Sequence, residues 1–307
     1  MPTPPLDHPS PPDGIGRVVT AMVTPFTAGR ALDLDGVAIL AEHLVANGTD
    51  TVLVNGTTGE SPTLQAAEAL EVLRVVRDTV DGRATVMLGT GSNDTAKTVA
   101  ATAAAADAGA DAVLVVTPYY NRPDQRGLDA HFKAAAAATD LPMVVYDIPS
   151  RSARAIDVAT HVSLAEVENI VGVKDATADC GRAGDLLRAT AGAPGGYAMW
   201  SGADEVNLPL LSVGAVGVVS VASHLVGPEL AAMVAAFPTD PARARQLHLA
   251  CLPVHRALFR EPSPAPLKGA LAKLGLPAGP VRPPLADASP AAVEAVLSAL
   301  RPIQEQR

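Results

Sequence analysis

Lys174 follows a short apolar run, Ile170 to Val173, whose composition predicts a buried strand. An amine held among apolar side chains loses the hydration of its charged form, so its pKa falls from about 10.4 toward neutrality. A neutral amine can attack a carbonyl carbon and form a Schiff base. The alternative is an ordinary lysine whose amine reaches solvent from the strand end, and this residue taken alone favours that alternative.

Hydroxyl groups that can transfer protons follow three other apolar runs. Tyr146 ends one of them, Tyr120 lies just after a second, and Thr57 lies just after a third. Forming an imine requires that the carbinolamine oxygen be protonated and lost as water, and two tyrosines linked by a threonine hydroxyl can relay that proton. Either tyrosine alone is more typical of an amphipathic rim residue than of a catalytic one. Three of the four tyrosines of the chain follow two strands, however, and this clustering favours the functional interpretation.

Two further groups are suited to a small carboxylate. The loop Gly56-Thr-Thr-Gly59 offers backbone N–H groups and two hydroxyls, and we expect a helix to begin beside it, near Thr63. The same residues also suit a simple tight turn. Arg151 follows a Pro-Ser turn, where its guanidinium can clamp a carboxylate or lie solvated at the surface.

The elements that position these residues are short apolar runs alternating with longer segments of helical period, which predicts parallel strands joined by helices. Eight such units favour a closed (β/α)8 TIM barrel over an open sheet, which would carry a Gly-rich phosphate fingerprint after its first strand. In such a barrel the working side chains project from the C-terminal ends of the strands. The predicted strands are 18–22, 51–54, 84–88, 112–116, 143–146, 170–173, 198–200 and 217–219.

Three segments divide the chain. Residues 1–13 contain six prolines, so we expect a disordered leader. Residues 14–226 hold the predicted barrel, with helices over 33–47, 63–80, 93–108, 128–138 and 205–212. Residues 227–307 show no strand pattern, and helical periodicity over 228–236, 240–258, 266–274 and 289–301 predicts a C-terminal helical subdomain packed on the barrel.

Composition disfavours several functional classes. The chain has 307 residues and a net charge of -9, and its basic residues never form a run, so we expect no nucleic-acid partner. No stretch reaches the roughly 18 consecutive apolar residues of a membrane span and no apolar leader is present, so we expect a cytoplasmic protein without a membrane partner. The two cysteines and seven histidines show no metal-ligand spacing, and we expect no metal site.

Four motifs resemble, in order and spacing, the pyruvate-dependent class I aldolases of the dihydrodipicolinate synthase and N-acetylneuraminate lyase family. The similarity extends from about Gly14 to Arg301. Four motifs in register are much more specific than any one of them, so the resemblance outweighs the structural alternatives given above. The motifs are Gly56-Thr-Thr-Gly-Glu-Ser61, Val116-Thr-Pro-Tyr-Tyr-Asn-Arg-Pro123, Tyr146-Asp-Ile-Pro-Ser-Arg151 and Val171-Gly-Val-Lys-Asp-Ala176.

The resemblance implies a catalytic role for four residues. Lys174 matches the lysine that forms an imine with pyruvate. Thr57, Tyr146 and Tyr120 match a proton-relay triad, and the tyrosine equivalent to Tyr120 reaches in from an adjacent subunit. The family is commonly a homotetramer built from two such dimers, and it needs neither a metal nor an organic cofactor.

The resemblance also implies how substrates are held. Thr58 and the backbone near Val219 match positions that bind the pyruvate carboxylate and line its pocket. Arg151 matches a residue that helps bind the carboxylate of aspartate 4-semialdehyde in the synthases of the family. The neuraminate lyases lack this arginine and usually have Ser-Thr in place of Thr57-Thr58. We therefore expect condensation of pyruvate with aspartate 4-semialdehyde on the diaminopimelate route to lysine.

Two alternatives stay open at this point. Within the family, the same machinery serves aldolases and lyases that act on a sugar acid or another 2-oxo-acid adduct, because specificity is set by pocket groups that motifs do not report. From a different class, a non-catalytic barrel can bind small oxo acids as a sensor. Retention of the lysine, tyrosines, threonines and arginine argues against a decayed site.

The chain departs from the common family pattern at several positions. Asp147 replaces a frequent Asn and Asp175 replaces a frequent Glu, a variant that looks like the high-GC Gram-positive branch. Ser152-Ala153 stands where Thr-Gly is common, and Ser201-Gly-Ala203 lacks an acidic residue often found there.

Regulation is also expected to differ. Lysine-inhibited members bind the effector at the dimer interface through His and Glu side chains, whereas the matching positions here are Ala66, Ala69 and Lys97. A lysine side chain repels a cationic effector. We therefore predict weak or absent feedback inhibition by lysine.

Overall fold

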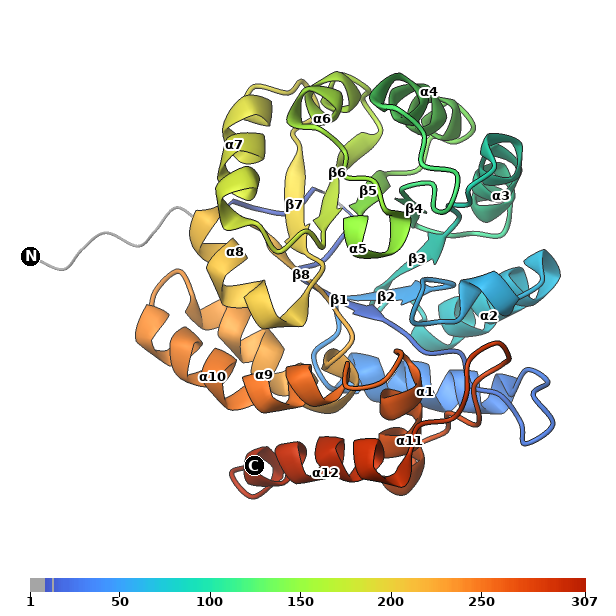
Figure 1. The fold of residues 1–307 in the computed structure, drawn as a ribbon, viewed down its shortest axis with the longest axis vertical. Coiled ribbons are helices and arrows are strands. Elements are labelled where there is room, and N and C mark those ends of the chain that lie inside the picture. Colours follow the sequence, from blue (N-terminus) through green and yellow to red (C-terminus); the bar gives the residue numbers. More distant parts are fainter. Residues whose placement is uncertain (1–8, 13) are drawn as a thin grey trace, which may run out of the picture. The chain divides into compact units, whose positions relative to one another are not determined.

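The computed structural model describes residues 9–12 and 14–307. Eight parallel strands form a closed barrel in the order β1 to β8, with helices between successive strands (Figure 1). This confirms the (β/α)8 barrel predicted from the sequence. The strands are β1 (Val18–Ala21), β2 (Thr51–Val54), β3 (Thr85–Gly89), β4 (Ala112–Val116), β5 (Met143–Asp147), β6 (Ile170–Asp175), β7 (Ala198–Ser201) and β8 (Gly217–Ser220).

Most of the predicted leader, residues 1–8 and 13, lies outside the described residues, and residues 9–12 belong to neither a helix nor a strand. The helices between β1 and β6 are α1 (Leu34–Ala46), η1 (Ser61–Thr63), α2 (Ala66–Val80), α3 (Thr95–Asp107), α4 (Gln125–Ala136), α5 (Pro149–Ser152) and α6 (Val158–Ala165). Those after β6 are α7 (Cys180–Thr190), η2 (Asp204–Val206), α8 (Asn207–Val213), α9 (Ser223–Ala236), α10 (Pro241–Ala257), α11 (Ala265–Lys273) and α12 (Pro290–Gln304). The label η marks a short 3-10 helix.

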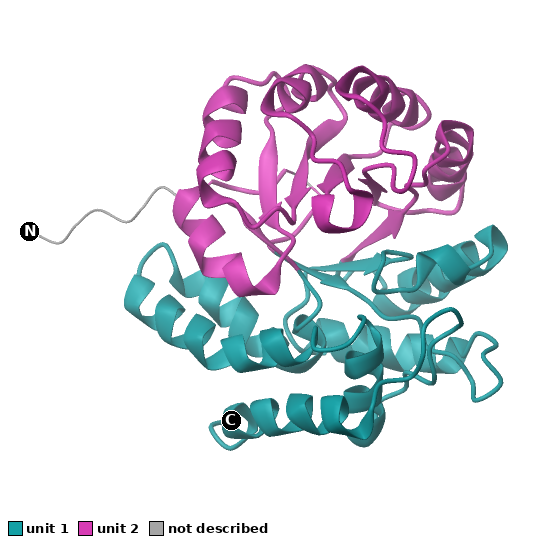
Figure 2. Cartoon of the chain, in the orientation of Figure 1, with its two compact units in different colours: residues 1–7, 18–84, 220–307 teal, residues 8–17, 85–219 magenta. Residues whose placement is uncertain are grey.

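The described chain divides into two compact units, coloured separately in Figure 2. Unit 1 contains Val18–Ala84 and Ser220–Arg307, and unit 2 contains residues 9–12, 14–17 and Thr85–Val219. The predicted boundary after residue 226 stays a prediction. It falls inside α9, where Val226 breaks the helical geometry with φ -126 and ψ 34.

Unit 1 holds the predicted C-terminal helices. Helix α9 packs against β1 and α1, while α10 packs against α9 and α12. These contacts cover apolar helix faces, because Leu230, Val254 and Val296 are buried. Helices α10, α11 and α12 match the segments predicted at 240–258, 266–274 and 289–301.

Unit 2 holds the pairing that brings the candidate catalytic residues together. In the register of β5 and β6, Tyr146 lies opposite Lys174 and Asp147 lies opposite Asp175. Successive side chains of a strand point to opposite faces, so Tyr146 and Lys174 share one face and the two aspartates share the other. Strand β6 was predicted to end at Val173 but continues to Asp175, which places Lys174 inside the strand.

Acidic and hydroxyl side chains begin several helices by accepting hydrogen bonds from backbone N–H groups of the first turn. The clearest caps are Asp33 for α1, Asp94 for α3, Asp124 for α4, Asp179 for α7, Asp240 for α10 and Ser289 for α12.

Some predicted helix starts were wrong. The helix expected from residue 63 begins at Ala66, because the chain forms the 3-10 turn η1 and then an extended residue, Leu64. The helix expected from residue 128 begins at Gln125, where Asp124 caps it. The helix expected over 205–212 is a 3-10 turn followed by α8.

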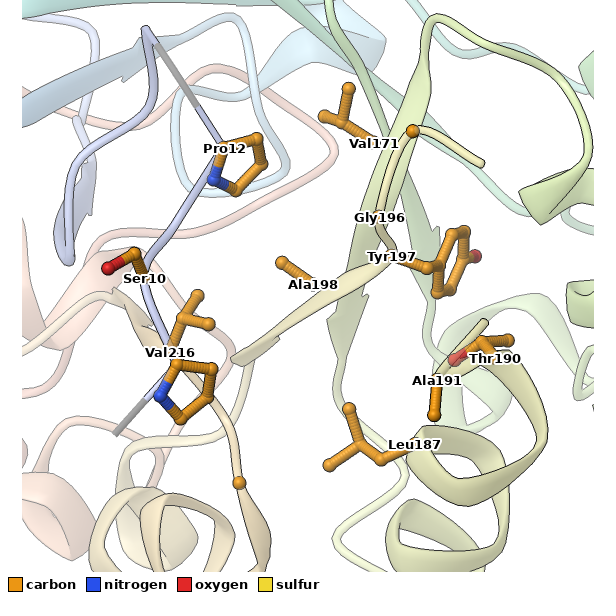
Figure 3. A pocket seen from close by; sticks show the side chains of 13 residues that line it. Ser10, Pro12, Val171, Leu187, Thr190, Ala191, Gly196, Tyr197, Ala198 and Val216 are labelled. Carbon is orange, nitrogen blue, oxygen red and sulfur yellow. The ribbon is translucent and has the colours of Figure 1, made fainter. Parts of the chain in front are cut away.

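A cavity of about 330 Å³ lies in unit 2 at the N-terminal ends of β6, β7 and β8 (Figure 3). Its lining includes Val171, Ala198 and Val216, together with Ser10 and Pro12 from the N-terminal segment. The strand end that carries Lys174 lies away from this cavity, since Val171 and Lys174 sit three positions apart along β6 and a strand rises about 3.3 Å per residue.

Among residues 9–12 and 14–307, no helix is long and apolar enough to cross a membrane. Nor does the described part of the chain contain a group of three His, Cys, Asp or Glu side chains placed to hold a metal ion.

Candidate active site

Lys174 is a buried lysine near the C-terminal end of β6, between two neighbouring strands. It pairs with Tyr146 of β5 on one side and with Trp200 of β7 on the other. Only 6% of Lys174 is exposed, and Trp200 is fully buried. Long charged side chains are almost never this buried unless they are paired, so this lysine calls for a physical explanation.

The amine of Lys174 lies over the ring of Tyr146, with Nζ 4.0 Å from the ring centroid. Within the described chain no hydrogen bond or ion pair to this amine accompanies the ring contact. Burial lowers the pKa of Lys174 from its ordinary value of 10.5 to about 7. The charge of Asp204 raises this pKa and that of Arg151 lowers it, both by less than burial does. Near neutral pH a substantial fraction of the amine is therefore uncharged and nucleophilic.

Gly202 makes room for the lysine stem. A Cβ on Gly202 would lie 2.9 Å from Cγ of Lys174 and 3.0 Å from the carbonyl oxygen of Asp175. The N–H of Gly202 also donates to that carbonyl at 2.6 Å. A side chain here would push β7 away from the lysine, so glycine is required by packing.

Tyr146 lies near the end of β5, where hydrogen bonds from Thr117 hold its backbone. Its backbone carbonyl accepts hydrogen bonds from Thr117 Oγ1 at 2.8 Å and from the Thr117 N–H at 2.9 Å. Only 5% of the residue is exposed. Burial raises the pKa of Tyr146 well above its ordinary value, so its phenol keeps its proton at neutral pH and can donate it.

Asp204 is a site residue that sequence reasoning missed. The stretch Ser201 to Ala203 was noted for lacking an acidic residue, but the next residue along, the first of the turn η2, supplies one. Asp204 is 5% exposed, accepts a hydrogen bond from Asn207 Nδ2 at 3.1 Å, and acts electrostatically on Lys174. An acidic residue just after β7, the strand paired with β6, was the signal that could have revealed it.

Arg151 and Val219 also lie in unit 2. Arg151 sits on the short helix α5 with an exposed side chain, and within the described chain it forms no ion pair. Its guanidinium is close enough to influence the pKa values of both Lys174 and Tyr146. Val219 is a buried residue of β8.

Tyr120 lies elsewhere on unit 2. It follows β4 in a left-handed backbone conformation, with φ 72, and 89% of the residue is exposed. Within a single chain its ring is therefore not buried against Lys174. A large, exposed aromatic ring held in a strained turn is typical of a residue that contacts a partner.

Thr57 and Thr58 lie in unit 1, on the loop between β2 and η1. Thr57 is partly exposed and Thr58 is 6% exposed. The loop is closed by hydrogen bonds from the N–H of Glu60 to the carbonyl of Thr57 at 3.1 Å and from the N–H of Ser61 to that of Gly56 at 3.3 Å. It is a structured turn that presents two hydroxyls.

The geometry of unit 2 supplies the parts that imine chemistry needs. A buried amine with a depressed pKa provides the nucleophile, and the protonated phenol beside it provides an acid. An exposed guanidinium provides a binding group for a carboxylate. These features, on a (β/α)8 barrel, define the class of lysine-dependent Schiff-base barrels.

Comparisons with known proteins agree with this class. The sequence model of the Dihydrodipicolinate synthetase family matches residues 14–302. The 4-hydroxy-tetrahydrodipicolinate synthase of Moorella thermoacetica is 48% identical over 287 residues, covering 93% of this chain and 97% of the relative. The 4-hydroxy-tetrahydrodipicolinate synthase 2 of Streptomyces coelicolor is 50% identical over 280 residues, covering 91% and 92%.

A solved structure shares the fold over almost the whole chain. The dihydrodipicolinate synthase of Bacillus anthracis superposes with a TM-score of 0.90 at 42% identity, covering 94% of this chain and 98% of that one. The chain therefore belongs to the Dihydrodipicolinate synthetase family.

Proposed function

We propose that the chain condenses pyruvate with aspartate 4-semialdehyde to give 4-hydroxy-tetrahydrodipicolinate, the reaction named for its relatives. The observation that carries the proposal is the buried Lys174 amine, which has a pKa of about 7 and lies 4.0 Å from the ring centroid of Tyr146. Such a residue is both nucleophilic and shielded from water, as a Schiff-base lysine must be.

The first chemical step uses the neutral amine. Lys174 attacks C2 of pyruvate, and the resulting carbinolamine loses its hydroxyl as water after an acid protonates it. The Tyr146 phenol is the proposed acid, because burial keeps it protonated. Removal of a proton from C3 of the imine then gives an enamine, whose C3 attacks the aldehyde carbon of the second substrate.

The remaining roles follow the family motif. The resemblance assigns Thr57 and Tyr120, like Tyr146, to the proton relay, and it assigns Thr58 and the backbone near Val219 to binding of the pyruvate carboxylate. Arg151 orients the semialdehyde by pairing with its carboxylate. The exposed guanidinium without an ion pair in the described chain supports this role. Cyclisation by the amino group of the semialdehyde onto C2 then releases Lys174.

The assembly proposed for this enzyme is a cytoplasmic homotetramer made of two dimers, working without a metal or an organic cofactor. The exposure of Tyr120 supports the dimer, because its ring is available to enter the site of an adjacent subunit. Replacing Tyr120 with Phe keeps the ring and removes the hydroxyl, so it is expected to slow turnover while leaving the dimer intact. Steady-state kinetics would measure the turnover of this variant, and sedimentation would show whether its dimer stays intact.

A coupled assay tests the function directly. The purified protein is mixed with pyruvate and aspartate 4-semialdehyde, and dihydrodipicolinate reductase with NADPH reports the product. Rapid loss of NADPH that requires both substrates is the expected result. Separately, borohydride with pyruvate is expected to leave one reduced adduct, on Lys174.

The two assays test the Schiff-base mechanism and the identity of the aldehyde substrate separately. An adduct on Lys174 without any loss of NADPH would keep the Schiff-base mechanism and discard aspartate 4-semialdehyde, directing attention to sugar acids and other 2-oxo-acid adducts. Absence of both would overturn the enzyme proposal itself.

A further inference from the structure

A pair of buried carboxylates stands directly behind the catalytic residues. Asp147 follows Tyr146 and Asp175 follows Lys174, and the two aspartates lie opposite one another in the β5–β6 register. Both aspartates are fully buried. They point to the face of the sheet opposite to that of Tyr146 and Lys174, so they take no direct part in the proposed chemistry.

Arg182 of α7 joins the two carboxylates. One terminal nitrogen of its guanidinium is 2.6 Å from Asp147 Oδ2, and the other is 3.0 Å from Asp175 Oδ2. The first nitrogen also donates to the carbonyl of Ile156. The Arg182 side chain is 18% exposed. In the described chain, no other arginine or lysine pairs with either aspartate.

The other hydrogen-bond partners of the aspartates are either close to them in sequence or weaker donors than Arg182. Asp175 Oδ1 accepts from the N–H and the hydroxyl of Thr177, at 2.8 and 2.7 Å. The N–H of Ile156 approaches Asp147 at 3.3 Å. His161 Nε2 is 3.7 Å from Asp147, while its Nδ1 is 2.8 Å from the hydroxyl of Tyr197. Among the described residues, Arg182 is therefore the one permanent cation shared by both strands at this point.

Removing that cation has a predictable mechanical consequence. Two uncompensated carboxylates in a low-dielectric environment repel each other strongly, and an unpaired buried charge is costly. The strands relieve this by moving apart, or one carboxylate takes up a proton. Because Tyr146 and Lys174 are the preceding residues of the same strands, a shift between the aspartates displaces the amine from the tyrosine ring.

We propose that Arg182 is a positioning residue for the Schiff-base reaction: by clamping Asp147 to Asp175 it holds Tyr146 and Lys174 in register. This inference rests on the proposed function, and it assigns the clamp a kinetic role beyond stability. The residue touches neither substrate, so its effect is expected on the rate of imine formation and not on the affinity for pyruvate.

Arg182→Gln tests the proposal, with Arg188→Gln as the matched control on the same helix. Within the described residues, the one ion pair of Arg188 is an exposed pair with Asp185, at 3.7 Å. The rate at which the borohydride-trapped adduct forms is measured at saturating pyruvate. Each rate is divided by the number of chains that can finally be trapped. The clamp variant is expected to react about 10- to 100-fold more slowly, since misplacement of a reacting group by about 1 Å costs that much. The KM of Arg182→Gln for pyruvate is expected to stay near the wild-type value. The control variant Arg188→Gln is expected to form the adduct at the wild-type rate.

A second substitution that restores the rate distinguishes a positioning effect of Arg182 from a simple loss of stability. In the double variant Arg182→Gln with Asp147→Asn, only one buried carboxylate remains and the repulsion disappears. This double variant is expected to recover most of the wild-type rate. Arg182→Lys keeps the charge but reaches only one carboxylate, so an intermediate rate is expected. If Arg182→Gln does not fold, these two variants carry the test.

Several outcomes would overturn the proposal. If Arg182→Gln reacts at the wild-type rate per trapped chain, Arg182 stabilises the fold but does not position the reacting residues. A slow rate that Asp147→Asn fails to relieve would lead to the same conclusion, as would a loss confined to KM. If instead wild-type protein traps no pyruvate on Lys174, the proposed function has failed, and this result is distinct from a failure of the clamp.

Discussion

Two lysines of this chain are buried almost equally, yet their surroundings are opposite. Lys174 in unit 2 is 6% exposed and Lys268 in unit 1 is 2% exposed. Each amine lies over an aromatic ring, at 4.0 Å from the centroid of Tyr146 and at 4.3 Å from that of Phe26. Burial lowers the pKa of both lysines. Burial and a ring contact therefore do not distinguish a reactive lysine from an inert one.

Hydrogen bonding makes the distinction. Lys268 donates to the Glu60 carboxylate at 2.7 Å and to the carbonyls of Thr24 and Pro280 at 3.0 and 2.9 Å. Three donors thus meet three acceptors, and the paired carboxylate partly offsets the effect of burial on the pKa of Lys268. Lys174 has no such acceptors within the described chain.

The comparison shows that one fold gives one buried lysine three hydrogen-bond acceptors and leaves another with a ring and more distant charges. A buried amine with a carboxylate at hydrogen-bond distance is held as an ammonium, because the pair compensates the cost of burial. A buried amine that meets only a ring and more distant charges gives up its proton near neutral pH. The same residue type is therefore paired in unit 1 and, under the proposed mechanism, reactive in unit 2.

The largest expected effect follows from removing the reactive lysine. Lys174→Met is expected to abolish borohydride-trapped pyruvate and to lower turnover at least about 10³-fold, because it removes the nucleophile. Methionine fills a similar volume, so thermal stability is expected to stay equal to or above that of wild type. Turnover near the wild-type rate in this variant would remove Lys174 from the mechanism.

The second effect is on stability. Lys268→Met leaves the Glu60 carboxylate buried without its cation, and breaking a buried pair in this way costs about 3–5 kcal/mol of unfolding free energy. Urea denaturation of wild type and variant measures the loss. In the double variant Lys268→Met with Glu60→Gln, part of this loss is expected to return. A variant as stable as wild type would show that the two lysines do not differ as described.

The third effect is a shift in pH dependence. Only the neutral amine reacts, so the rate of imine formation with limiting pyruvate is expected to rise with pH through about 7 and then level off. Asp204 raises the pKa of Lys174, so Asp204→Asn is expected to move the midpoint to lower pH. Arg151 lowers that pKa, so Arg151→Met is expected to move it to higher pH. Shifts in the opposite directions would contradict the electrostatic account.

The smallest effect concerns a third lysine, which is exposed. Lys97 lies on α3, and the family resemblance implies that it matches a position in the effector site of lysine-inhibited members. A cation there opposes binding of free lysine, so we expect added lysine to inhibit turnover weakly or not at all. A sharp fall in activity at sub-millimolar lysine in the coupled assay would refute this prediction.

Much of this protein could be predicted from local sequence. Short β-branched runs bury both faces and so form the parallel strands of a barrel, and each strand was recognised within a residue or two of its bounds. Lys174 and Tyr146 were recognisable because they end two such runs, and neighbouring strand ends in a barrel meet. The starts of α2 and α4 were mispredicted, because a short turn and a cap outweighed the helical pattern.

The tertiary structure alone decided which charges meet. Lys268 and Glu60 are separated by 208 residues and Arg182 and Asp147 by 35, and no local pattern links either pair. The sequence by itself determined the order of strands and the residue types at their ends, since periodicity and burial act over a few residues. The partner of a buried charge depends instead on which elements pack together, and this determined which lysine carries the proposed chemistry.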